Sequence, residues 1–144
     1  MKNTPNNQEK ESLGELINRA AYCISHDLNQ RMRQLGLDMT VWPILQYLWQ
    51  QDGLPQARIS ELIGRPEYST SRAVDRLEAS GLVARRHDPC NRRVRLIFLT
   101  DAGRASQASL APLAEGTNEK VMGQLARDEQ EQLMSLLRKI IGVL

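Results

Sequence analysis

The chain is poor in the residues on which enzymes and disulfide-rich proteins depend. Its 144 residues include two histidines and two cysteines, Cys23 and Cys90, and no Cys-x-x-Cys spacing. Two cysteines cannot build a disulfide framework, and we find no grouping of nucleophile, base and orienting residue, nor a nucleotide-binding loop. The sequence therefore predicts a protein that is not an enzyme, with no cofactor, no catalytic residues and no metal site, in a reducing compartment.

Long apolar runs are also absent. No segment approaches the about 20 apolar residues that a membrane span needs, and the N-terminal segment MKNTPNNQEK has no apolar stretch for export. We expect a cytoplasmic protein without membrane contact, in which residues 1–11 form a disordered tail. The hydrophobic content of 41% is enough for the remaining chain to bury a core.

Lysine is missing from the middle of the chain. Residues 58–95 contain nine arginines, five acidic residues and no lysine, so this segment carries a formal charge of +4 within a chain of net charge +2. The planar guanidinium fork suits bidentate contact with phosphate or guanine better than a point charge does. The pattern favours a localised nucleic-acid contact over a polycation that coats nucleic acid. A solvated arginine-rich surface is the alternative.

Both ends of the chain follow a helical apolar period. We expect N-caps at Ser12, Thr40, Thr100 and Asp128. The helix after Thr100 runs from residue 101 into the low 120s with a bend at Pro112. The last helix carries a broad apolar stripe that includes Leu133, Leu136, Leu137, Ile140 and Leu144. We therefore expect residues 12–36 and 101–144 to form a helical dimerisation region, although a monomeric bundle is an alternative.

The middle of the chain, residues 37–100, changes from a helical period to an alternating one. The segments RISELIG and STSRAVDRLEASG are two short helices joined by a tight turn, and LVARRH and VRLIFL face each other across DPCNRR as a hairpin. This order predicts a mainly α (α+β) fold, a winged helix-turn-helix with N- and C-terminal dimerisation helices. Its second short helix enters the major groove and its wing the minor groove, unless the domain binds protein instead.

The segments ISELIGRPEYSTSRAVDRLEASGLVARR and DPCNRRVRLIFLTDAGR resemble the MarR family of transcriptional regulators. The resemblance extends from Leu13 to Leu144 and is nearest to the SlyA-like branch. It implies a homodimer that binds an inverted-repeat operator in double-stranded DNA, acts as a repressor and is released by a small aromatic or phenolic ligand. One difference lies at the wing tip, where Asn91 stands at a position that the family commonly fills with aspartate.

The expected DNA-binding residues lie on the recognition helix, the helix before it and the wing. They are Arg58, Ser69, Thr70, Ser71, Arg72, Arg76, Arg92 and Arg93. The resemblance implies that Arg72 reads a base edge, that Arg92 enters the minor groove, and that Arg93 pairs with Asp75 and so orients the wing. Arg93 could instead be solvated. Arg85, Arg86 and Arg95 alternate along the wing strands, so some of them must point away from DNA.

Two mechanisms of regulation are open. Arg19, Tyr22 and His26 recur on one face of the first helix and Trp42 and Gln46 on one face of the second, where they could line a cleft for an aromatic ligand. The tyrosine and tryptophan could equally be core residues. The rival mechanism is redox control through Cys90, which lies beside two arginines. Non-specific architectural binding to DNA is the alternative to regulation.

Overall fold

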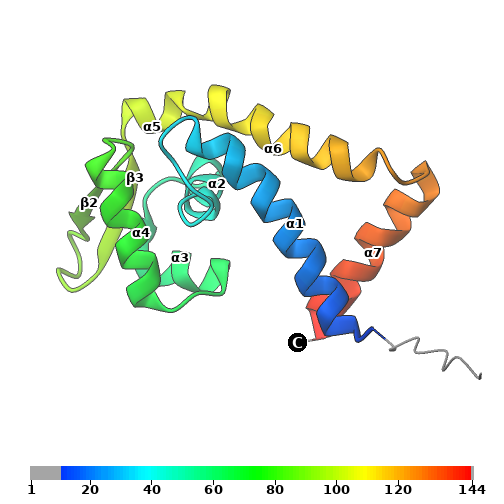
Figure 1. Ribbon diagram of the computed structural model, residues 1–144. Helices are drawn as coiled ribbons and strands as arrows, with labels where there is room; N and C mark the ends of the chain where they lie inside the picture. The colour runs from blue at the N-terminus through cyan, green and yellow to red at the C-terminus, as the bar shows by residue number, and fades with distance from the viewer. Residues whose placement is uncertain (1–10, 144) are drawn as a thin grey trace, which may run out of the picture.

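The computed structural model describes residues 11–143 (Figure 1). The elements are α1 (Leu13–Arg33), α2 (Trp42–Gln50), β1 (Leu54–Pro55), α3 (Gln56–Ile63), α4 (Glu67–Ala79), β2 (Val83–His87), β3 (Arg95–Leu99), α5 (Asp101–Ala105), α6 (Gln107–Met122) and α7 (Arg127–Val143). The mainly helical winged helix-turn-helix is confirmed. The expected tail lies almost wholly outside the described residues. None of the described helices has the length and apolarity of a membrane span.

Two of the four expected helix caps are confirmed. The Ser12 side chain accepts from the N–H of Glu15 and the Glu15 carboxylate accepts from the N–H of Ser12, at 3.2 and 2.9 Å. The Thr100 hydroxyl accepts from the N–H of Gly103 at 3.0 Å. Each cap satisfies helix N–H groups that have no partner within the helix.

The other two expected caps are wrong. The N-cap of α2 is Val41, whose side chain forms no capping hydrogen bond. Thr40, the expected cap, lies one residue earlier and donates its N–H to Asp38. Helix α7 begins at Arg127, one residue before Asp128. At this end of the helix the N–H of Ala126 donates to the carboxylate of Glu129.

The helix expected after Thr100 is divided at Ser106 into α5 and α6. The Ser106 hydroxyl donates to the Gly103 carbonyl at 2.7 Å, so a side chain competes there with the helical ladder. Pro112 lies inside α6.

The winged domain has a three-stranded antiparallel sheet in the order β1-β3-β2. The two-residue strand β1 places Leu54 opposite Ile97. Strand β2 places Val83 opposite Leu99, so alternate residues of the wing strands enter the core. Helices α3 and α4 are joined at Gly64, whose φ of 63° is the left-handed conformation that glycine adopts at a helix end.

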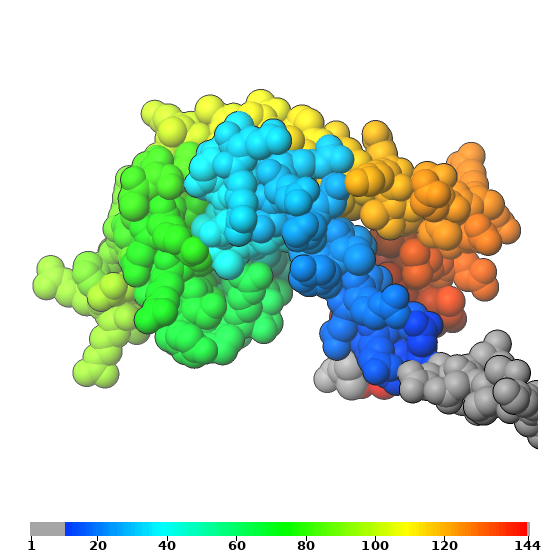
Figure 2. All heavy atoms as spheres, viewed as in Figure 1, coloured from blue at the N-terminus to red at the C-terminus, as the bar shows by residue number. Residues whose placement is uncertain are grey.

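The hydrophobic core is continuous from the first helix to the sheet. Leu28 and Met32 of α1 are buried in the same cluster as the residues of α2, α3, α4 and the sheet, and Leu110 joins it from α6. The terminal helices extend beyond this core. The first half of α1 and all of α7 project away from the winged domain (Figures 1 and 2), and no described side chain of α7 is buried.

A polar cluster around Asp27 joins α1 to α6. The Asp27 carboxylate accepts from Thr117 at 2.7 Å, from Lys120 at 2.8 Å and from Arg31 at 2.9 Å. These hydrogen bonds, those from Lys120 and Thr117 above all, hold the pKa of Asp27 well below its usual value. Because Thr117 is 1% exposed, part of this cluster is shielded from water.

The low pKa of Asp27 predicts a pH-dependent contribution to stability. A carboxylate whose folded pKa is depressed stabilises the fold above its unfolded pKa of about 4, and the contribution is lost as the pH falls below that value. We expect Asp27→Asn to melt at a lower temperature than the wild type at pH 7, with the difference shrinking below about pH 4. Melting curves followed by circular dichroism from pH 7 to pH 3 measure it. A difference that is constant with pH would contradict the assignment.

Candidate DNA interface

The second helix of the helix-turn-helix, α4, presents one face to the core and one to solvent. Its buried residues are Thr70, Ala73, Val74 and Leu77. Its exposed residues include Tyr68, Arg72 and Arg76, which are spaced four apart and therefore share one stripe. This stripe of α4 is open to solvent.

The structure changes the expected roles of two of the three hydroxyl residues at the start of α4. Thr70 is 1% exposed and its hydroxyl donates to the Pro66 carbonyl, so the expectation that it contacts DNA is wrong. Ser71 is half-buried, and both its carbonyl and its hydroxyl accept hydrogen bonds from Arg85. Ser69, half-exposed in the first turn, is the hydroxyl residue left on the open side of the helix.

Arg76 is tied to the segment before α2. Its guanidinium donates to Asp38 at 3.0 Å and to the Thr40 hydroxyl, although the side chain stays 53% exposed. The neighbouring Arg65 donates to the Thr40 carbonyl at 2.9 Å. Arg76 therefore stabilises the position of α4, and its charge toward DNA is already partly compensated by Asp38. Arg58, on α3, is exposed and pairs with Glu61 at 2.9 Å.

The wing tip carries the two arginines that the sequence singled out. Arg92 and Arg93 are exposed, and the hairpin projects from the body of the molecule as a finger (Figure 2). Side chains of the turn bond its backbone: Asn91 accepts from the N–H of Arg93 at 3.1 Å, and the His87 ring contacts the Arg92 carbonyl at 2.8 Å. Asn91 thus supports the turn without adding a negative charge at the tip.

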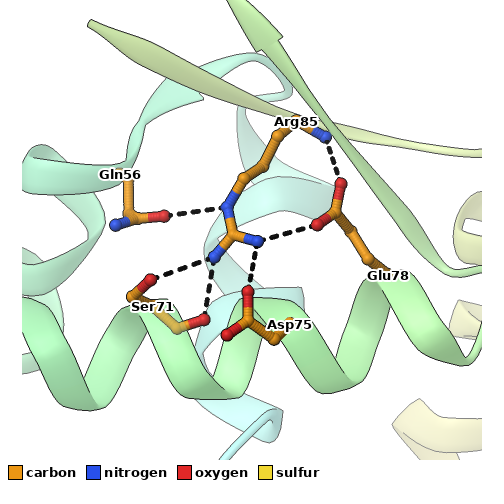
Figure 3. A network of polar contacts seen from close by, with 5 residues as sticks. All are labelled: Gln56, Ser71, Asp75, Glu78 and Arg85. Carbon is orange, nitrogen blue, oxygen red and sulfur yellow. Dashed lines mark hydrogen bonds and ion pairs between the residues drawn. The ribbon is translucent and has the colours of Figure 1, made fainter. Parts of the chain in front are cut away.

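Arg85 connects the wing to both helices of the helix-turn-helix (Figure 3). Its Nε donates to Gln56 at 3.1 Å, one Nη to Asp75 at 2.5 Å and Glu78 at 2.7 Å, and the other to the carbonyl and hydroxyl of Ser71 at 2.8 and 3.2 Å. All five N–H donors of the guanidinium have acceptors. The side chain is 13% exposed. Its backbone N–H also donates to Glu78, at 2.9 Å.

The expected pairing of Arg93 with Asp75 is therefore wrong in this structure. Asp75 pairs with Arg85, and within residues 11–143 Arg93 forms no ion pair. The reason is strand parity: Arg85 lies two residues after the buried Val83 and points to the same face of the sheet, toward α4. That parity was readable in the sequence and is the signal that sequence reasoning missed.

The five expected ligand-binding residues do not converge. Trp42 and Gln46 line a hollow of about 290 Å³ between α2 and α6. Tyr22 and His26, with stacked rings 5.7 Å apart, line a separate hollow of about 310 Å³ between α1 and the segment before α2. Arg19 lines neither hollow and pairs with Glu11 at 2.6 Å. The expectation of one cleft within a single chain is wrong, because the two helices present these residues in different directions.

Residues 35–94, which contain the helix-turn-helix and most of the wing, match the model of a protein family described as "MarR family". Over these residues the chain is similar to the MarR family. It is 29% identical over 101 residues to the transcriptional regulator HosA of Escherichia coli O111:H-, a match that covers 70% of this chain and 75% of HosA. HosA is described as a transcriptional regulator, and the resemblance indicates a DNA-binding transcriptional regulator.

Solved structures of transcriptional regulators share the fold along nearly the whole chain. The transcriptional repressor CouR bound to a 23-mer DNA duplex superimposes with a TM-score of 0.86 at 26% identity, covering 97% of this chain and 99% of CouR. A probable transcriptional regulator from Pseudomonas aeruginosa gives a TM-score of 0.83 at 28% identity, covering 92% and 99%. The likeness to the SlyA-like branch within the family stays a prediction.

Proposed function

We propose that this protein is a MarR-family repressor that binds an inverted-repeat operator as a homodimer and is released by a small aromatic ligand. The observation that carries the DNA-binding part is the Arg85 network, because it fixes the wing to the recognition helix α4. Arg72 on α4 and Arg92 and Arg93 on the wing are thereby presented together. In this proposal Arg72 reads a base edge and the wing arginines enter the adjacent minor groove.

The remaining contacts are to the DNA backbone. Ser69 and the first turn of α4 approach phosphate, and Arg58 on α3 reaches a phosphate when it leaves Glu61. Arg76 supports α4 through Asp38 and contributes less charge to the interface than the sequence suggested. The structure of CouR bound to a 23-mer DNA duplex supports this use of the fold.

The homodimer is proposed from the projecting helices α1 and α7. Their large apolar side chains are exposed in the single chain, including Leu13 at 63%, Leu16 at 46% and Leu136 at 48%. Exposed apolar side chains gathered on two helices in this way are typical of a surface through which proteins associate. Residues 12–36 and 101–144 form the dimerisation region in this proposal, and 37–100 form the DNA-binding domain.

The ligand is proposed to occupy the hollow beside Trp42 and Gln46. Its described lining contains the carboxylate of Glu115 and no lysine or arginine, so a neutral phenol fits it better than an aromatic carboxylate does. Melting curves with matched pairs of phenols and benzoates, followed by operator-release assays, test this. If benzoates stabilise the protein and phenols do not, the proposed preference for neutral phenols is wrong.

The whole proposal is tested by selecting bound fragments from the source genome in the presence of excess unrelated duplex. A regulator enriches fragments with a common inverted repeat near promoters. Enrichment of random fragments would instead favour the architectural alternative, in which only phosphate contacts count.

Arg72→Ala is expected to weaken operator binding by roughly 1–3 kcal/mol and to relax the preference at one base pair of each half-site. The charge-matched control is Arg138→Ala, which removes an exposed arginine on the polar side of α7. Titrations against the operator and its single-base variants measure both effects. Equal losses on operator and random duplex would show that Arg72 touches only the backbone.

Arg92→Ala is expected to weaken binding to many sequences, because a wing-tip arginine acts through charge and groove width. Loss of one phosphate-neutralising contact per protomer should reduce the slope of log K against log salt by about 0.9 for each contact. The loss should be largest where A·T-rich DNA flanks the half-sites. An unchanged salt slope would place Arg92 away from the groove.

A further inference from the structure

Tyr68 is the aromatic residue of the winged domain that the fold does not use. Its side chain is 72% exposed, in the first turn of α4. The other four aromatic residues between positions 37 and 100 are packed. Trp42 is buried, Tyr47 donates to the Leu62 carbonyl, Trp49 donates to the Gly103 carbonyl, and Phe98 lies under the guanidinium of Arg86.

The position of Tyr68 places it on the surface that faces DNA in the proposed function. It lies four residues before Arg72 on the same exposed stripe of α4. Helix α4 stands at the end of the molecule opposite the projecting α7 (Figure 1), so association through the terminal helices leaves Tyr68 uncovered. Within residues 11–143 its hydroxyl has no hydrogen-bond partner in the chain.

The chemistry of the ring selects its partner on the duplex. In the major groove the base edges present hydrogen-bonding groups and one apolar group, the C5-methyl of thymine. A phenol ring at the start of the recognition helix can cover that methyl and exclude water from it, while Arg72 one turn further reaches a neighbouring base edge. A phosphate would engage the hydroxyl and leave the apolar face of the ring in water.

We propose that Tyr68 is a specificity-determining residue that packs against a thymine methyl group in each half-site. This inference rests on the proposed function and adds to it a defined base preference. Burial of a methyl group contributes about 0.8 kcal/mol, which corresponds to about a fourfold change in affinity per half-site.

The test compares binding-site selection from random duplex by the wild type, Tyr68→Phe and Tyr68→Ala. The wild type and Tyr68→Phe are expected to select the same site, and Tyr68→Ala to lose the preference for one thymine per half-site. Replacing that thymine by uracil removes only the methyl group. It should weaken wild-type binding about fourfold per half-site and leave Tyr68→Ala unaffected.

Uracil at a thymine outside the half-sites is the control on the DNA, and equal melting temperatures of the variants are the control on the fold. If Tyr68→Ala selects the wild-type site with the same thymine dependence, Tyr68 does not read the methyl group. If Tyr68→Phe binds as weakly as Tyr68→Ala and uracil has no effect, the hydroxyl contacts phosphate. If the wild type selects no sequence, the proposed function itself fails and this inference with it.

Discussion

Ile140→Arg is expected to separate the proposed dimer into monomers and to abolish operator binding at nanomolar protein concentrations. Ile140 lies near the middle of the apolar face of α7 and is 37% exposed in the single chain. In a two-fold interface each substitution occurs twice, so an arginine here places two unpaired charges in one apolar surface. The cost is about 3 kcal/mol or more, which is over a hundredfold in the dimer dissociation constant.

Loss of the dimer removes the second recognition helix from the operator. In the dimer, binding of one recognition helix raises the effective concentration of the second at its half-site, and a monomer lacks this gain in affinity. Sedimentation velocity at micromolar concentration measures the association, and titration with the selected operator measures the binding.

The matched control is Ser135→Arg, which places the same charge on the polar side of α7. Ser135 is exposed and lies roughly opposite the apolar stripe around the helix. It should leave both the association and the operator affinity near those of the wild type. An Ile140→Arg protein that still sediments as a dimer would show that α7 does not form the interface.

Arg85→Met is expected to release the wing from the helix-turn-helix and to destabilise the domain by about 2–4 kcal/mol. Methionine keeps much of the apolar stem but leaves Asp75 and Glu78 close together without the cation that now binds both. Water can reach Asp75, which is 61% exposed, so the cost falls below that of a fully buried unpaired charge.

DNA binding should fall with stability in this variant, on operator and random duplex alike, because the wing contributes to both. Arg85→Lys should be intermediate, since an ammonium has three donors where the guanidinium has five. Asp75→Asn combined with Arg85→Met should cost less than the two single changes added together, because they break the same contact.

Arg86→Met is the matched control for Arg85→Met. Arg86 is the next residue of the same strand, is exposed and lies over the ring of Phe98 at 5.1 Å. Its loss removes the same charge and costs about 1 kcal/mol or less. Equal melting temperatures for the Arg85→Met and Arg86→Met proteins would show that the Arg85 network does not hold the wing.

Much of the fold was determined by local sequence. Hydroxyl caps at Ser12 and Thr100, the tight turn between α3 and α4 and the alternating wing strands each depend on residues near one another in the chain. Local propensity and periodicity therefore predicted them. The exposed positions of Arg92 and Arg93 belong to the same class, because a hairpin tip is exposed wherever the hairpin lies.

Only the tertiary structure decided which distant side chains meet. Asp75 had several arginines within reach along the chain, and the pairing of β2 with β3 and its packing on α4 selected Arg85. Thr70 lies on the buried side of α4 because packing against α3 and β2 fixes how that helix is rotated. Tyr22 and Trp42 line different hollows because α1 and α2 diverge. Periodicity assigns residues to a face of one element, but packing between elements determines what that face contacts.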